Sequence, residues 1–219
     1  MKISNQRTTD PATEVATVAQ MDTFLRGDNV LESVDGELLT SLIQSAREYV
    51  EEFTGRALIT QTWTLFMDGF PQTRDPLGWW DGVREGSITQ GQANAFELPI
   101  GPLQSVTSIS TFDDDNTETT FAASNYYLNT TATPGEVILN TGATWPVFTR
   151  NRNGIKVVYI AGYGDNATDV PSPLRTAVKQ LAAHWYENRE FTKTQSGMNQ
   201  AAAPIHVQSI LNRYKVQKL

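Results

Sequence analysis

The sequence predicts an α+β protein, in which a helical core of three or four helices is interrupted by an inserted, mostly antiparallel β-module. Apolar residues recur at three- and four-residue spacing between Leu38 and Phe53, and again between Leu174 and Trp185, as on amphipathic helices. Between these two stretches lie short β-branched and aromatic runs that turn residues separate. This order of elements is typical of two helical halves with a β-insertion.

The first half of the helical core is expected to begin near Thr17. Thr17 and Gln20 have the spacing of a capping box, which predicts a short helix that ends at residues 27–29. Asp35 is expected to cap a second, longer helix, and Gly55 is expected to end it because glycine is the usual residue past a helix C-terminus.

The remaining helices are expected near the other end of the sequence. Pro171-Ser172-Pro173 predicts a helix start, because proline is tolerated in the first helical turn. Residues 192–203 show no periodic pattern and are interpreted as a linker. A last short helix is expected after Pro204.

The β-module is predicted from its short strand-like runs and turns. Asp113-Asp114-Asp115-Asn116 is expected to form a hairpin tip. The expected strands cover residues 62–67, 96–99, 106–112, 118–121, 126–128, 136–139 and 155–160.

These elements predict a division of the chain into four parts. The expected parts are an N-terminal arm (1–16), a helical core (17–59 plus 165–191), the inserted β-module (60–164), and a linker with a C-terminal arm (192–219).

Composition excludes several classes of protein. The net charge is −7 and the pI is about 4.8, whereas binding to nucleic acid phosphates needs clustered Lys and Arg. The sequence has no run of 18 apolar residues, so no membrane span is expected. The sequence contains 0 cysteines, which excludes a disulfide framework, a thiol nucleophile and cysteine metal ligands. A chain without cysteines also suits synthesis in a reducing cytoplasm.

The sequence contains no recognisable motif of an active site. His184 and Glu187 are three apart on a helix, but no third metal ligand accompanies them. Gly162-Tyr163-Gly164 lacks the lysine and further glycines of a phosphate loop, and is interpreted as a turn. The Asp113–Asp115 run lacks the spaced ligands of an EF-hand. We therefore expect no catalytic residue, no metal and no cofactor.

Two groups of residues are candidates for a contact with a neighbouring subunit or another protein. Trp79 and Trp80 lie among Gly, Asp and Pro residues, where they either fold back over the β-module or dock on a neighbour. The exposed hairpin tip at Asp113, Asp114 and Asp115 is the second candidate.

A series of short motifs runs through the chain from about residue 18 to the end. They are Asp35-x-x-Leu38 with Leu42-Ile43-x-x-Ala46-Arg47-x-x-Val50-Glu51-x-Phe53-Thr54-Gly55-Arg56-Ala57-Leu58, Ile59-Thr60-Gln61-Thr62-Trp63, Asp68-Gly69-Phe70-Pro71, Trp79-Trp80-Asp81-Gly82-Val83-Arg84-Glu85-Gly86, Leu98-Pro99-x-x-Pro102-Leu103-x-Ser105-Val106, Tyr159-x-Ala161-Gly162-Tyr163-Gly164, Val170-Pro171 and His184-Trp185-Tyr186-Glu187-Asn188-Arg189-Glu190. In their order and spacing these motifs resemble the phage head–tail connector (adaptor) family, in the variants with a β-insertion that siphophages, prophages and gene transfer agents carry.

The resemblance implies a structural virion protein of the phage neck, made in the host cytoplasm. It implies a homo-oligomeric ring, commonly of about twelve copies, below the portal protein. Tail-side proteins, a stopper or a tail-completion protein, would attach to this ring, and DNA would pass through its channel without specific binding. The net negative charge agrees, because an acidic lumen lets DNA slide.

The C-terminal arm is expected to carry the portal contact. From residue 191 to the end the sequence holds four basic residues and no acidic residue. Such a charge complements an acidic rim, and a short helix needs a surface to bury against. A helix folded back on its own core is the alternative. The expected portal-interface residues are Val207, Ile210, Leu211, Arg213, Tyr214, Lys215 and Lys218.

Two other functions remain open at this point. A stopper or tail-completion protein is also acidic, ring-forming and enzymatically silent, and a β-barrel core in place of helices would favour it. A glycan-binding or hydrolytic tip module would suit exposed tryptophans, but it lacks an acid–base pair.

Overall fold

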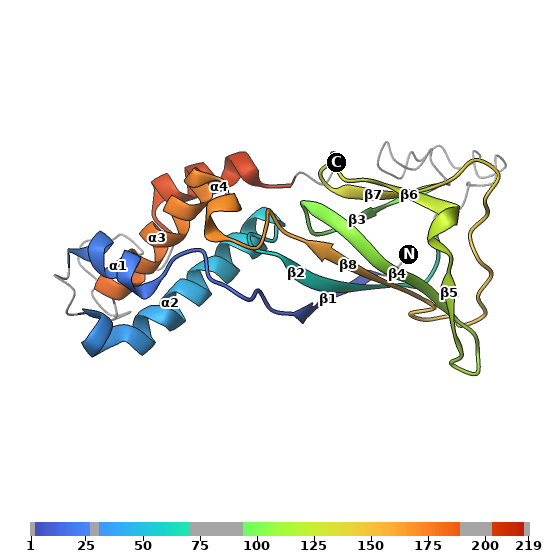
Figure 1. Ribbon diagram of the computed structural model, residues 1–219, viewed down its shortest axis with the longest axis horizontal. Coiled ribbons are helices and arrows are strands. Elements are labelled where there is room, and N and C mark those ends of the chain that lie inside the picture. The colour runs from blue at the N-terminus through green and yellow to red at the C-terminus, as the bar shows by residue number, and fades with distance from the viewer. Residues whose placement is uncertain (1–2, 27–30, 71–93, 189–202, 217–219) are drawn as a thin grey trace, which may run out of the picture. The chain divides into compact units, whose positions relative to one another are not determined.

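The structure, a computed structural model (Figure 1), describes residues 3–26, 31–70, 94–188 and 203–216, with the backbone alone at residues 31 and 32. These residues form two compact units. The helical unit is built from Pro11–Thr60 and Gly162–Val216, and the β-unit from Gln61–Ala161 together with the residues up to Asp10. Helices and antiparallel strands are both present, which confirms the predicted α+β class.

Four α-helices make up the described part of the helical unit. They are α1 (Val18–Leu25), α2 (Leu31–Thr54), α3 (Ser172–Glu187) and α4 (Ile205–Tyr214). The capping box at the start of α1 is confirmed, since Gln20 N–H donates to Thr17 Oγ1 at 3.2 Å. Helix α2 consists of a short first segment and a longer second one that meet at a kink, where Asp35 has non-helical angles of φ −119° and ψ 19°. The longer segment therefore starts at Asp35, where the sequence predicted the start of a helix, and the short segment before it was not predicted.

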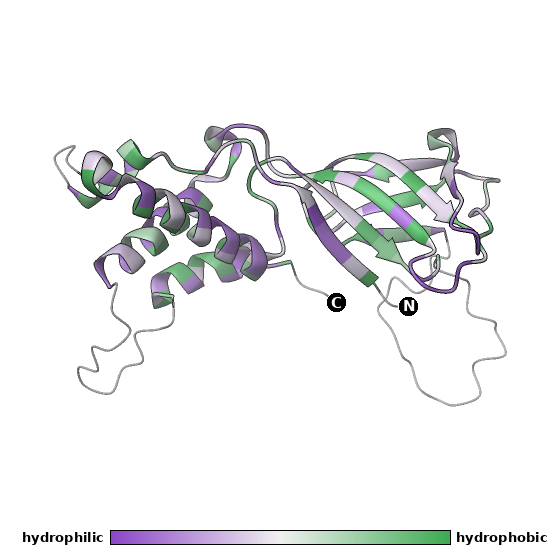
Figure 2. Ribbon diagram, turned by 90° about the horizontal axis from the view of Figure 1, so that it is seen from below, coloured by the Kyte–Doolittle hydropathy of each residue, from purple (hydrophilic) through white to green (hydrophobic). Residues whose placement is uncertain are grey.

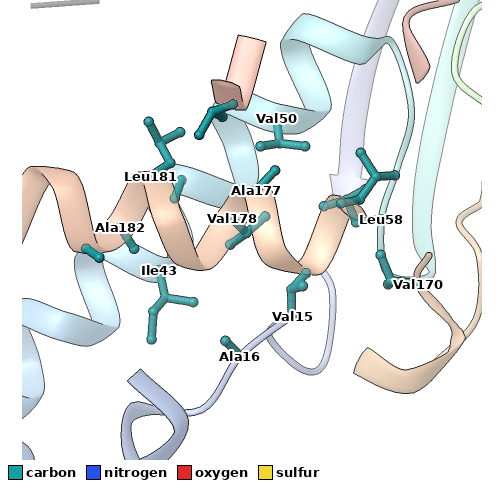
Figure 3. Packing of buried hydrophobic residues seen from close by; sticks show 14 of the residues in the cluster. Val15, Ala16, Ile43, Val50, Leu58, Val170, Ala177, Val178, Leu181 and Ala182 are labelled. Carbon is teal, nitrogen blue, oxygen red and sulfur yellow. The ribbon is translucent and has the colours of Figure 1, made fainter. Parts of the chain in front are cut away.

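The core of the helical unit combines segments from both halves of the chain. Ile43 and Val50 of α2 lie against Ala177, Val178, Leu181 and Ala182 of α3, as Figure 3 shows. Figure 2 shows apolar and polar bands alternating along these helices, which is the mark of amphipathic packing. The fully buried residues of this core also include Val15, Ala16, Met21, Leu58, Val170, Leu174, Val207 and Leu211.

Glycines let the chain turn at two places in this unit. Gly55 follows α2 with φ +68°, the left-handed conformation that ends helices and that the sequence predicted here. Gly162 has φ +143°, and a Cβ there would collide with the backbone of Ile59 and Thr60. Thr60 N–H donates to Gly164 O at 3.0 Å. The Gly162-Tyr163-Gly164 motif therefore serves close backbone packing.

The β-unit contains two antiparallel sheets. The five-stranded sheet has the order β1-β2-β8-β4-β5 and the three-stranded sheet the order β3-β7-β6. The strand bounds are β1 Ile3–Thr9, β2 Gln61–Met67, β3 Ala95–Leu98, β4 Leu103–Phe112, β5 Glu118–Phe121, β6 Tyr126–Asn129, β7 Gly135–Leu139 and β8 Ile155–Ala161.

The two sheets pack together through apolar and aromatic side chains. Residues of β8 alternate between buried and half-buried, as expected for a strand with one face in a core. A Cβ on Gly135 of β7 would collide with Leu103 of β4, so the glycine lets the two strands approach closely. Phe70 stacks on Trp145 with ring centroids 4.5 Å apart, and Phe121 stacks on Tyr126 at 5.9 Å.

The residues expected to form an N-terminal arm belong to these units. Strand β1 pairs with β2 at the edge of the larger sheet, from Ile3↔Met67 to Thr9↔Thr62. Tyr159, which is buried, donates its hydroxyl proton to Asn5 Oδ1 at 3.2 Å. The prediction of an arm is wrong because backbone pairing and a few polar contacts suffice to hold an edge strand whose side chains are mostly exposed.

Candidate assembly surfaces

The titratable side chains of the described residues form no metal-binding cluster. Within the described residues, no cluster of three His, Cys, Asp or Glu side chains can hold a metal ion. His184 lies near the end of α3, where its Nδ1 is 3.2 Å from the Asn188 amide nitrogen. None of the helices in the described ranges is sufficiently long and apolar to cross a membrane.

A buried ion cluster joins the segment before α1 to α2. Arg47 is 1% exposed, and its Nε donates to Glu14 Oε2 at 2.9 Å while its Nη1 donates to Glu51 Oε2 at 2.8 Å. The other carboxylate oxygen of Glu51 accepts the N–H of Leu58 at 2.8 Å. Burial lowers the pKa of Arg47, but the Glu14 hydrogen bond and the Glu51 charge outweigh it, so the net direction is upward.

This cluster was not predicted from the sequence. The four-residue spacing of Arg47 and Glu51 on one helix is a signal that an ion pair leaves. Glu14 leaves no such signal, because it lies 33 residues away in the chain. The cluster is structural, since all three side chains are engaged with each other or with the backbone.

The C-terminal helix lies on the core of its own unit. Val207 and Leu211 of α4 are both 0% exposed, and Ile210 and Tyr214 pack against the same core. The helix is therefore folded back on its own core, which was the alternative to an arm that buries its apolar stripe on the portal. The apolar stripe that suggested a partner surface is satisfied by α2 and α3, as is usual for a short amphipathic helix.

Polar contacts hold the end of α4 against the end of α2. Arg56 Nε donates to the carbonyl oxygen of Tyr214 at 2.6 Å, and Val216 N–H donates to Thr54 O at 2.8 Å. The Lys215 ammonium lies 5.3 Å from the centre of the Phe53 ring. These contacts use groups at a helix C-terminus that would otherwise lack partners.

The cationic residues of this segment have a different environment from its apolar ones. Arg213 and Lys215 are exposed, whereas Val207 and Leu211 are not. Lys218 lies outside the described residues. A contact between a neighbouring protein and this end of the chain would therefore involve the basic side chains and not the apolar stripe.

The acidic hairpin tip is exposed and has a defined conformation. One Asp113 carboxylate oxygen accepts the backbone N–H of Asp115 at 3.0 Å and of Thr117 at 2.8 Å. The Asp114 N–H donates to Thr149 Oγ1 at 3.0 Å. Strands β4 and β5 pair on either side of this turn, which confirms the predicted hairpin. Trp79 and Trp80, the other predicted contact residues, lie outside the described residues.

The chain resembles proteins of viral necks in sequence and in fold. Residues 146–215 match the family described as phage gp6-like head-tail connector protein. This segment contains β8, α3 and α4. None of the curated proteins matches the chain significantly.

Solved structures resemble nearly the whole chain. A chain in the neck of an empty gene transfer agent particle, computed with C6 symmetry, has a TM-score of 0.72 and 23% identity, and the match covers 99% of this chain and 97% of that one. A chain in the virion of a native gene transfer agent particle has a TM-score of 0.71 and 23% identity, over 98% of this chain and 96% of that one.

The neck of the native gene transfer agent particle, computed with C12 symmetry, gives a third match. Its TM-score is 0.62 at 23% identity, over 97% of both chains. At this identity the likeness demonstrates a shared fold. Together with the family match over residues 146–215, it confirms the resemblance to head–tail connectors that the sequence predicted.

Proposed function

We propose that the chain is a structural protein of a virion neck, a head–tail connector that forms a ring beneath the portal protein and joins the capsid vertex to the tail. The match of residues 146–215 to the connector family carries this proposal. The shared fold supports it, because the similar chains come from necks of gene transfer agent particles.

The shifted pKa values in the described part of the chain have structural causes. In the described part of the chain the titratable groups with shifted pKa values are Arg47, Glu118 and three tyrosines, and ion pairing or burial explains each shift. None of them combines a nucleophile with a neighbouring general base. The function is therefore proposed to depend on surfaces.

The symmetry of the similar particles supports a homo-oligomeric ring. The two necks are computed with C6 and C12 symmetry, and both orders are compatible with about twelve copies around one axis. With a net charge of −7 per copy, such a ring would hold DNA weakly and allow it to pass.

The portal contact is proposed to involve the exposed cations Arg213 and Lys215. They lie at the end of α4, on a segment that carries no acidic residue. Opposite charge on the portal rim would steer the contact and set its orientation. Charge reversal at both positions leaves the core of the helical unit intact, because neither side chain is buried.

Mixing purified chain with rings of the portal protein tests the proposed function. Electron microscopy should show a second ring attached to one end of the portal, and Arg213→Glu/Lys215→Glu should reduce its occupancy. A stopper would instead bind portals only after another neck protein was added. A glycan-binding module would leave portals bare and give heat on titration with oligosaccharides.

A further inference from the structure

An open apolar hollow lies on the surface of the helical unit between α1 and α3. It encloses about 460 Å³ and is lined by Ala19, Gln20, Thr23 and Phe24 of α1 and by Lys179 of α3. Phe24 leaves 45% of its surface exposed there. A large aromatic side chain at the rim of a hollow is typical of a surface that another protein covers.

A second apolar residue projects from the same unit at the beginning of α2. Val34 is 71% exposed. It precedes the kink at Asp35, where the backbone departs from helical geometry. Tyr186 of α3 donates its hydroxyl proton to Asp35 Oδ2 at 2.6 Å, so the kink is tied to α3. The first turn of α2 is thus held in a direction that the rest of the helix does not follow.

The hollow and the beginning of α2 carry side chains of opposite charge. Glu37 is exposed and lies three residues after Val34, while Lys179 lines the hollow. Neither side chain makes an ion pair within the residues that the structure describes. An aliphatic side chain with a neighbouring carboxylate therefore complements the hollow in both polarity and charge.

We propose that Val34 and Glu37 of one copy dock into the α1–α3 hollow of a second copy, where Glu37 pairs with Lys179. The inference rests on the proposed function, because a closed ring requires each copy to present two different surfaces that fit each other. The occupant is a second copy because the chain itself supplies an exposed apolar residue and, within the described residues, an acid without an ion pair that the hollow fits.

Charge reversal tests the pairing in rings assembled on portal protein. Glu37→Lys or Lys179→Glu alone should raise the concentration of chain needed for half-maximal ring formation by about tenfold, because each places like charges in contact. The double variant Glu37→Lys/Lys179→Glu should return to within about threefold of the original chain, since the pair is restored with its charges exchanged.

Disulfide cross-linking tests whether the two surfaces meet, whatever their contact contributes to the affinity between copies. The sequence contains 0 cysteines, so introduced thiols are the only ones present. Val34→Cys chains mixed with Thr23→Cys chains should form disulfide-linked dimers during ring assembly, and neither variant alone should do so. Val147→Cys is the matched control, because it is 90% exposed but belongs to the β-unit.

The outcomes separate this inference from the proposed function. Single charge variants that assemble like the original chain, a double variant that fails to recover, or equal cross-linking by the Val147→Cys control would overturn the docking. Rings that form normally but no longer recruit tail proteins would assign the hollow to a tail partner and also overturn it. If the original chain forms no ring on portals, the proposed function fails and the docking with it.

Discussion

Residues 3–25 and residues 203–216, the first and last described segments of the chain, are held by different combinations of forces. The first is held by a backbone ladder along β1, by the pairing of Glu14 with Arg47 and by the burial of Val15, Ala16 and Met21. The second is held by the burial of Val207 and Leu211. The sequence predicted arms at residues 1–16 and at residues 192–219. Their difference teaches that polar residues help to anchor a segment when their partners lie in the fold.

The largest expected loss of stability follows from removing Arg47, which pairs with Glu14 and Glu51. Arg47→Met should lower the free energy of unfolding by about 3–5 kcal/mol, because it leaves the buried carboxylate of Glu51 without its cation. Urea unfolding followed by circular dichroism measures this loss. Arg26→Met, at an exposed position, is the control and should change the value by less than about 0.5 kcal/mol.

Truncation of a buried apolar side chain of α4 should lower the free energy of unfolding almost as much. Leu211→Ala should cost about 2–4 kcal/mol, because it opens a cavity among α2, α3 and α4. Ile205→Ala, on the same helix but 85% exposed, should cost less than about 0.5 kcal/mol. Equal effects of the two variants would mean that α4 does not lie on the core in solution.

Not every polar group in the first segment is compensated. Both carboxylate oxygens of Asp22 are buried and have no hydrogen-bond partner in the described chain, and the residue is 1% exposed. Asp22→Asn should therefore raise the free energy of unfolding by about 1–2 kcal/mol, because it removes a buried charge. The exposed Asp165→Asn serves as the control in thermal unfolding, and a destabilised Asp22→Asn would reveal an unrecognised partner.

The capping box tests a smaller contribution to the same segment. Thr17→Ala should lower the free energy of unfolding by about 1 kcal/mol, because Gln20 N–H loses its acceptor at the start of α1. Thr176→Ala, at an exposed position inside α3, should leave stability nearly unchanged or raise it slightly. Chemical denaturation of both variants distinguishes a cap from a general helix effect.

The exposed ion pair between Lys156 and Glu118 should contribute least to stability, in contrast to the buried pairs of Arg47. Lys156 Nζ lies 3.1 Å from Glu118 Oε1, and this hydrogen bond lowers the pKa of Glu118. A lowered folded pKa stabilises the fold above the unfolded pKa, and the gain is lost as pH falls through the folded value. Because the pair is solvent-exposed, Glu118→Gln should cost less than about 0.5 kcal/mol at neutral pH. Its effect should vanish in acid.

The sequence predicted the elements well where a local signal existed. The capping box at Thr17, the turn at Gly55 and the β4–β5 hairpin all depend on neighbouring residues, and the structure contains them. Strand β1 was missed because its sequence, ISNQRTT, has no alternating apolar residues. An edge strand of this kind is defined by its partner in the sheet.

The candidate assembly surfaces were less predictable from the sequence than the fold. The apolar stripe of α4 was read correctly as amphipathic, but periodicity does not tell whether a helix buries its stripe within its own chain or against another. The hollow between α1 and α3 combines residues about 160 positions apart in the chain, and the hydrogen bond from Tyr186 to Asp35 joins α3 to the kink of α2. Such features arise only from the tertiary contacts.

A reconstruction of the particle that carries this chain tests the central claim most directly. The account predicts a ring of copies of this chain in the neck, between the portal and the tail, with the fold described here fitting the density of each copy. A neck without that density, or the same fold found in the tail tip or as separate molecules outside the neck, would contradict it.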